Sequence, residues 1–264
     1  MSTNKIGEVC RFLEDIAPLH LQETYDNAGL LTGDKDWPIK GVLFALDATE
    51  EVVLEAVTMG CNLVISHHPI IFKGLRNLTP DHYVARAVIQ AIKHDIALYA
   101  IHTNLDNVLT HGVSARMAGQ LGLLQPRILC PRDATGTTGA GIVASLPEPI
   151  SETELLQLVR DRFHCGNIRH SPLLGRSVQS ISLCGGSGSF LIGDAIRSRA
   201  EVYITADLKY HEFFEANDQI LLLDIGHFES EQFTIALLYE LVIKNYSNFA
   251  AHCTKMNTNP VQYF

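Results

Sequence analysis

Apolar, β-favouring runs alternate with helical patterns along the first part of the chain, and this alternation limits the possible folds more than any other feature. The run GVLFALDAT (41–49) precedes the helical pattern EEVVLEAVTMG, and NLVIS (62–66) follows it. A helical pattern over about 81–94 and the run IALYAIH (96–102) continue the series. Strands separated by helices pair in parallel and have both faces of their sheet covered. The sequence therefore predicts an α/β protein with a mainly parallel sheet.

The second half of the chain repeats the rhythm without repeating the residues. Ser151 and Glu154 in SETE predict a capping box at the start of a helix, and a long helix is expected over 229–244. Between the halves the pattern lapses at 123–139. We expect two α/β lobes, 1–128 and 129–264, with mixed, mainly parallel sheets, and the last segment can pack back on the first lobe.

Composition narrows the possible partners and the compartment. The chain has 20 Lys and Arg against 29 Asp and Glu, a net charge of −9, which disfavours direct binding of nucleic acid. No apolar segment reaches the ~20 residues that a membrane helix needs, and the N-terminus lacks a signal-peptide pattern. A cytoplasmic location is therefore expected. The six cysteines form no CxxC pair, which disfavours a thiolate metal site.

Histidines and carboxylates stand where predicted strands end, at the edge where loops of an open α/β sheet converge. They lie in SHHP (66–69), HTNLD (102–106), TADLKYH (205–211) and GHFESE (226–231). Imidazole and carboxylate together suit zinc, iron or manganese. The predicted ligands are His67, His68, Asp106, His227 and Glu231.

Two ions fit this set better than one. Neighbouring residues of an extended strand point to opposite sides, so His67 and His68 can each serve a different ion. His227 and Glu231 are four residues apart at the start of a helix and can face one point. Two ions ~3.5–4 Å apart form a known catalytic arrangement. The two lobes are then expected to face a shared metal-binding cleft.

Each motif also has an ordinary structural explanation. The histidine pair can be a hydrogen-bonded loop, HTNLD can cap the next helix, and His227 with Glu231 can be a surface pair. GGSGS (185–189) can expose N–H groups to a phosphate, but it lacks the GK[ST] of a P-loop, and a tight strand-to-helix turn is the favoured interpretation. His211 can orient a ligand or contact substrate, or it can be an ordinary helix histidine.

Several motifs in this order resemble a known family. They are YDNAGLLTGD (25–34), LVISHHPIIFKGLRNLT (63–79), YAIHTNLDN (99–107), CGGSGSFL (184–191), VYITADLKYHEF (202–213), DIGHFESE (224–231) and NPVQYF (259–264). Together they are similar to the GTP cyclohydrolase 1 type 2 homologs, also called NGG-interacting-factor-like or dinuclear metal centre hexameric proteins, in the compact form without an inserted domain.

The resemblance implies two divalent metal ions between two lobes, held by the five ligands named above, and a homohexamer. As an enzyme, the chain is expected to carry out metal-assisted hydrolysis of a nucleotide or related small molecule, in which Glu231 bridges the ions and His102 and His211 are candidates for proton transfer or for orienting the ligands. Zinc is the expected metal, and iron or manganese fits the same ligands. The alternatives are a non-catalytic metal-binding or scaffolding hexamer and a metal-dependent phosphoesterase or peptidase.

Overall fold

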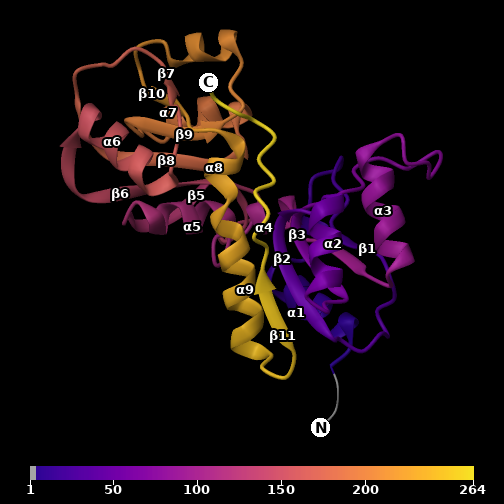
Figure 1. Ribbon diagram of the computed structural model, residues 1–264. Coiled ribbons are helices and arrows are strands. Elements are labelled where there is room, and N and C mark those ends of the chain that lie inside the picture. The colour runs from indigo at the N-terminus through magenta and orange to yellow at the C-terminus, as the bar shows by residue number, and fades with distance from the viewer. Residues whose placement is uncertain (1–3) are drawn as a thin grey trace. The chain divides into compact units, whose positions relative to one another are not determined.

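The chain folds into two compact units, as a computed structural model that describes residues 4–264 shows (Figure 1). Unit 1 extends to Leu105 and takes up the later segment Thr234–Pro260. Unit 2 comprises Asp106–Phe233 and Val261–Phe264. The division after Leu105 comes earlier in the chain than the expected division at 128 and 129. The reason is that residues such as Leu123 and Ile128 belong to the hydrophobic core of unit 2.

Unit 1 is built on a five-stranded sheet of order β1-β4-β3-β2-β11. Strands β2, β3, β4 and β11 are parallel, and β1 pairs antiparallel with β4 at the edge. The strands are β1 (Gly29–Thr32), β2 (Gly41–Asp47), β3 (Leu63–His68), β4 (Ala97–Ala100) and β11 (Ala250–Cys253). The helical segments are α1 (Ile6–Ile16), η1 (Leu19–Leu21), α2 (Glu50–Thr58), α3 (Tyr83–Lys93), α4 (Thr103–Asp106) and α9 (Phe233–Asn245).

Helices cover both faces of this sheet, as continuous apolar strands require. On one face, Leu43 and Val64 pack in one cluster with Val53 of α2 and Val88 of α3. On the other face, the ring of Phe44 meets Tyr239 of α9 edge-on, with 5.9 Å between the centroids. The buried sheet is therefore fixed from two sides, and the carboxyl ends of β3 and β4 hold the histidines in place.

Unit 2 is built on a six-stranded mixed sheet of order β5-β6-β8-β9-β10-β7. Strands β8, β9 and β10 are parallel, and the remaining pairs are antiparallel. The strands are β5 (Leu124–Pro131), β6 (Gly139–Ser151), β7 (Arg169–His170), β8 (Ser177–Ser187), β9 (Val202–Ala206) and β10 (Leu221–Asp224). The helical segments are α5 (Val113–Gln120), α6 (Glu152–Phe163), η2 (Ser189–Leu191), α7 (Ile192–Arg197), η3 (Tyr210–Ala216) and α8 (His227–Glu231).

The two faces of this sheet also carry separate cores. Ile181 and Ile204 pack with Val159 of α6 on one face, and Tyr203 packs with Ile192 of α7 on the other. The capping box predicted at the start of α6 is confirmed: Glu154 N–H donates to Ser151 Oγ at 3.2 Å, and Ser151 N–H donates to the Glu154 carboxylate at 2.8 Å.

The α/β class with two mixed sheets is confirmed. The sequence patterns located β2, β3, α1, α2 and α3. They gave no strand over 123–139, where the structure has the whole of β5, because that strand has exposed residues along much of its length. Among the described residues, no helix is long and apolar enough to cross a membrane.

Candidate metal centre

Three imidazoles of unit 1 lie together at the ends of β3 and β4. The ring centroids of His67 and His68 are 5.0 Å apart, and the ring of His102 lies 5.2 Å from the first and 5.3 Å from the second. One ring nitrogen of each histidine lies within 4.8 Å of the others. We expected the rings of His67 and His68 to point to opposite sides. Both rings lie against that of His102 at the end of the strand, and the part of each in binding a different ion stays a prediction.

Each of these rings is held by a hydrogen bond at Nδ1. His67 bonds the backbone carbonyl oxygen of Ile101 at 2.8 Å, and His68 bonds Oδ1 of Asp47 at 2.7 Å. His102 bonds Oδ1 of Asp26 at 2.7 Å. Since carbonyl and carboxylate oxygens only accept, the proton of each ring resides on Nδ1. Each ring therefore presents the lone pair of Nε2, which is how histidines are fixed as metal ligands.

Asp26 is the more enclosed of the two carboxylates, with its side chain fully buried. Burial raises its pKa, but the hydrogen bond and charge of His102 and the bond from the Thr103 hydroxyl outweigh this and hold the pKa at about 2. Asp47 also accepts a bond from the hydroxyl of Thr258, at 2.5 Å. Asp26 is therefore ionised at neutral pH, and Asp47 is held by a second hydrogen-bond donor.

The polar residues of HTNLD (102–106) hold the chain in place around His102. Asn104 Oδ1 accepts from the backbone N–H of His102 at 2.9 Å, and the Asn104 amide donates to Ala17 O at 2.6 Å. The Thr103 hydroxyl accepts from Glu23 N–H at 2.8 Å. The next helix, α5, has Gly112 at its N-cap and no side-chain cap hydrogen bond, so HTNLD does not cap it.

Unit 2 contributes an imidazole between two carboxylates. His227 Nε2 lies 3.1 Å from Oε2 of Glu231 on the next turn, and His227 Nδ1 lies 2.7 Å from Oδ2 of Asp207. Burial lowers the pKa of His227, but Glu231 and Asp207 together outweigh it and raise the pKa to about 11. The hydrogen bond from His227 lowers the pKa of Asp207. Asp207 follows the end of a predicted strand but was not among the predicted site residues.

The glycine-rich stretch brings the main chain against this pair. Gly186 has φ +62°, and a Cβ added there would lie 2.4 Å from Oε1 of Glu231 and 3.2 Å from Cε1 of His227. Its N–H donates to the Ser230 hydroxyl at 2.9 Å. β8 ends at Ser187 and η2 begins two residues later, as the tight-turn interpretation predicts. Glycine is required here because only a residue without a side chain leaves room for Glu231.

Asp106 lies near Glu231 within unit 2. Burial, with the carboxylates of Asp106 and Glu231, raises the pKa of the Cys184 thiol well above its ordinary value. Cys184 is buried, so both carboxylates border one enclosed region. Unit 2 thus brings together three of the predicted ligands: Asp106, His227 and Glu231.

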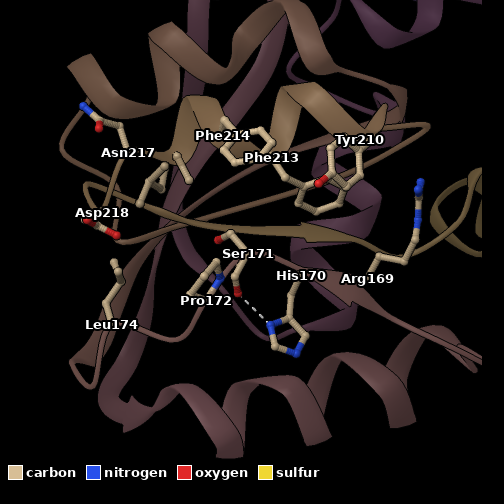
Figure 2. Close-up of a pocket in the computed structure, with 12 residues that line it drawn as sticks. Arg169, His170, Ser171, Pro172, Leu174, Tyr210, Phe213, Phe214, Asn217 and Asp218 are labelled. Atoms are coloured by element: carbon tan, nitrogen blue, oxygen red, sulfur yellow. Dashed lines mark hydrogen bonds between the residues drawn. The ribbon is translucent and has the colours of Figure 1, made fainter.

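His211 lies elsewhere on unit 2. It is exposed on η3, and its ring contacts those of Tyr210 and Phe214. Those two aromatic residues line a cavity of about 580 Å³ together with the segment that begins at Arg169 (Figure 2). No predicted metal ligand lines this cavity. A part for His211 in proton transfer stays a prediction.

The fold and the side-chain clusters define an α/β protein of two units with groups of histidine and carboxylate side chains that could bind metal ions. Comparison with known proteins agrees. The model of the Duf34/NIF3 (NGG1p interacting factor 3) family matches residues 4–260, and the chain belongs to this family.

The sequence similarity to individual relatives extends over most of the length of both proteins. A GTP cyclohydrolase 1 type 2 homolog of Clostridium perfringens is 36% identical over 228 residues, 86% of this chain and 87% of that protein. The protein of the same name from Streptomyces coelicolor is 31% identical over 97% of this chain and 93% of its own. The structure is similar to a hypothetical protein of Staphylococcus aureus, with TM-score 0.92, 29% identity and full coverage of both chains. It is also similar to reduced HcgD from Methanocaldococcus jannaschii, with TM-score 0.79, 25% identity and coverage of 97% and 100%.

Proposed function

We propose that this chain is a metal-dependent hydrolase with two divalent ions per subunit. The ligands in this proposal are His67 and His68 from unit 1 and Asp106, His227 and Glu231 from unit 2. The observation that carries it is the fixing of the imidazoles: His67, His68 and His227 each have Nδ1 hydrogen-bonded to an oxygen acceptor. An ordinary surface or loop histidine does not need such a partner, whereas a ligating histidine is oriented by one.

The ligand chemistry favours zinc, with iron as the nearest alternative. Three imidazoles and two carboxylates form a nitrogen-rich set that suits borderline metals and is poor for Mg²⁺ or Ca²⁺. The thiols do not compete for the ion, because burial raises the pKa of Cys184, the cysteine beside the carboxylates. We therefore expect zinc to be bound in preference to magnesium when both are offered.

Bound ions would supply Lewis acidity and a water of lowered pKa. The protein's own groups then have separate tasks in the proposed reaction. Gly186 and Ser230 fix the turn against which Glu231 packs, so the carboxylate would be held in place as a metal ligand. Asp207 holds His227 in one tautomer. His102 stands beside His67 and His68 and is placed to bind or move a proton near the reacting water.

The proposed substrate is a nucleotide or a related small molecule, in a cytoplasmic homohexamer. The curated relatives named GTP cyclohydrolase 1 type 2 homolog support this substrate class and no particular compound. The test is an assay of the zinc-reconstituted protein against nucleoside triphosphates, phosphate esters and carboxylic esters. We expect turnover that is lost in Glu231→Ala and kept in Glu215→Ala, a substitution of an exposed glutamate on η3.

Activity that survives Glu231→Ala would contradict the hydrolase proposal. Metal binding at full stoichiometry without turnover of any compound would instead favour a non-catalytic metal-binding protein. Sedimentation of the reconstituted protein tests the homohexamer separately from the chemistry.

A further inference from the structure

The cavity of unit 2 between η3 and the segment that begins at Arg169 has the properties of a site for a small molecule. Its volume of about 580 Å³ lies within the range of about 300–1,000 Å³ that is usual for such sites. The buried side chains of Ala216 and Ile220 give it an apolar floor, and charged side chains stand at its edge. An apolar lining with a few polar groups is typical of ligand sites.

Aromatic side chains of η3 form one wall of this cavity (Figure 2). The ring of Tyr210 meets that of Phe214 edge-on, with 5.7 Å between the centroids, and Phe213 lies beside them. Tyr210 is 73% exposed and Phe214 is 68% exposed, so their ring faces are open to the cavity and to solvent. Open aromatic faces of this kind stack on planar rings such as nucleobases.

The guanidinium of Arg169 lies at one end of the aromatic wall. Its Cζ stands 5.6 Å from the centroid of the Phe213 ring. Its Nη2 bonds to the carboxylate of Asp224 and donates to the carbonyl oxygen of Leu208 at 2.9 Å. These contacts fix the guanidinium, and its Nε and Nη1 groups can still donate to a ligand. A fixed planar fork of donors suits one phosphate group.

The carboxylate of Asp218 lies at the opposite end of the cavity from Arg169 (Figure 2). A second anionic group of a ligand would be repelled there, whereas N–H groups of a heterocyclic ring can donate to the carboxylate. The charges of the cavity therefore match a ligand with a nitrogen-bearing ring at one end and one anionic group at the other.

We propose that this cavity binds a nucleoside monophosphate, with its base stacked on the exposed rings of Tyr210 and Phe214 and its phosphate at Arg169. None of the proposed metal ligands lines the cavity. The inference therefore goes beyond the proposed hydrolase function, and binding at this site needs no metal ion.

The test is calorimetric titration of the full chain with the four common nucleoside 5′-monophosphates in buffer that contains EDTA, so that no metal ion holds a phosphate. At least one nucleotide is expected to bind more tightly than its own nucleoside and than inorganic phosphate. Phe214→Ala is expected to weaken this binding about 5–150-fold, the range for loss of one stacked ring. Phe190→Ala removes a similarly exposed phenylalanine of unit 2 outside the cavity and should bind like the wild type.

Arg169→Lys tests the phosphate end of the site. Lysine keeps a positive charge beside Asp224 but lacks the planar fork. The variant is expected to bind the nucleotide only as tightly as the nucleoside, with the affinity for the nucleoside unchanged. A readout on the wild type guards against variants that merely misfold: with ¹³C-labelled aromatic rings, the nucleotide is expected to shift the signals of Tyr210 and Phe214 and to leave those of Phe190 in place.

Failure of all four nucleotides to bind, or binding that Phe214→Ala and Arg169→Lys leave unchanged, would overturn this inference. Self-association of the wild type that Phe214→Ala abolishes, without nucleotide binding, would overturn it in favour of a contact with a second copy of the chain. Each of these results leaves the proposed hydrolase intact, because that proposal is tested at Glu231. Nucleotide binding in EDTA beside a zinc-loaded protein without turnover would support the cavity site and contradict only the hydrolase.

Discussion

His102 donates from Nδ1 to the carboxylate of Asp26 at 2.7 Å, and the side chain of Asp26 is fully buried. The two residues are 76 positions apart in the sequence, so only the folded unit 1 joins them. Paired in this way, His102 has one tautomer and one ring orientation. The same relationship holds between His68 and Asp47 and between His227 and Asp207.

Asp47→Asn should weaken metal binding without removing a ligand. The substitution removes the charge that favours Nδ1–H on His68, and loss of such a partner typically costs about 10–100-fold in metal affinity. Competition with a chromophoric chelator measures the change. Asp81→Asn, at an exposed loop position, is the matched control and should bind like the wild type. Equal affinities for the two variants would show that Asp47 does not support the site.

Gly186→Ala should displace Glu231 and destabilise unit 2. A Cβ at φ +62° meets the Glu231 carboxylate at 2.4 Å, and the left-handed backbone alone costs an alanine about 1–2 kcal/mol. We expect a loss of at least that size in the free energy of unfolding, measured by urea titration, together with loss of one bound ion. Gly119→Ala on α5 meets nothing within 4 Å and should be neutral or stabilising by up to about 1 kcal/mol. A fully stable, fully metallated Gly186→Ala protein would contradict the packing described here.

Four of the six thiols should resist modification in the native protein. Burial raises the pKa of Cys10 to about 12, of Cys61 to about 11 and of Cys165 to about 12, and it raises that of Cys184 further. Their thiolate fraction is therefore small at pH 8, and the thiolate is the reactive form. Titration with a disulfide reagent should count at most two thiols before unfolding and six after it. The two are the partly exposed Cys130 and Cys253. Rapid reaction of more than two would contradict the assigned burial.

Asp133 should stabilise the β5–β6 hairpin in a pH-dependent way. Hydrogen bonds from Thr135 and Thr138 hold its pKa well below the ordinary value. A carboxyl whose pKa is lowered by folding contributes stability that is full above its unfolded pKa of about 3.9 and is lost as the pH falls below it. The difference in urea midpoint between the wild type and Asp133→Asn should thus be constant from pH 7 to pH 5 and smaller at pH 3. A difference that grows on acidification would contradict this.

The sequence predicted the elements whose pattern is local and continuous. The buried strands β2 and β3 read as unbroken apolar runs, and α1 and α3 show one apolar face. The short edge strands β1, β7 and β11 were missed because most of their residues are exposed or only partly buried, so they form no apolar run, whereas the equally short β4 is buried throughout.

The motifs of the sequence were sufficient to predict the candidate metal ligands. They were not sufficient to predict the carboxylates that hydrogen-bond to the imidazoles. His67, His68 and His227 stand in recognisable motifs, whereas Asp26, Asp47 and Asp207 are ordinary loop or strand-end carboxylates until the fold brings them to an imidazole. One signal was available: Asp47 and Asp207 stand at or just after the ends of predicted strands, at the edge where the histidines also lie.

The most direct test of the central claim is the anomalous diffraction of crystals grown with Zn²⁺. We expect two anomalous peaks for zinc about 3.5–4 Å apart, as in two-metal catalytic sites, with His68 of unit 1 and His227 of unit 2 both among the ligands. Absence of bound zinc at these residues, or a single ion held by ligands of unit 2 alone, would contradict it.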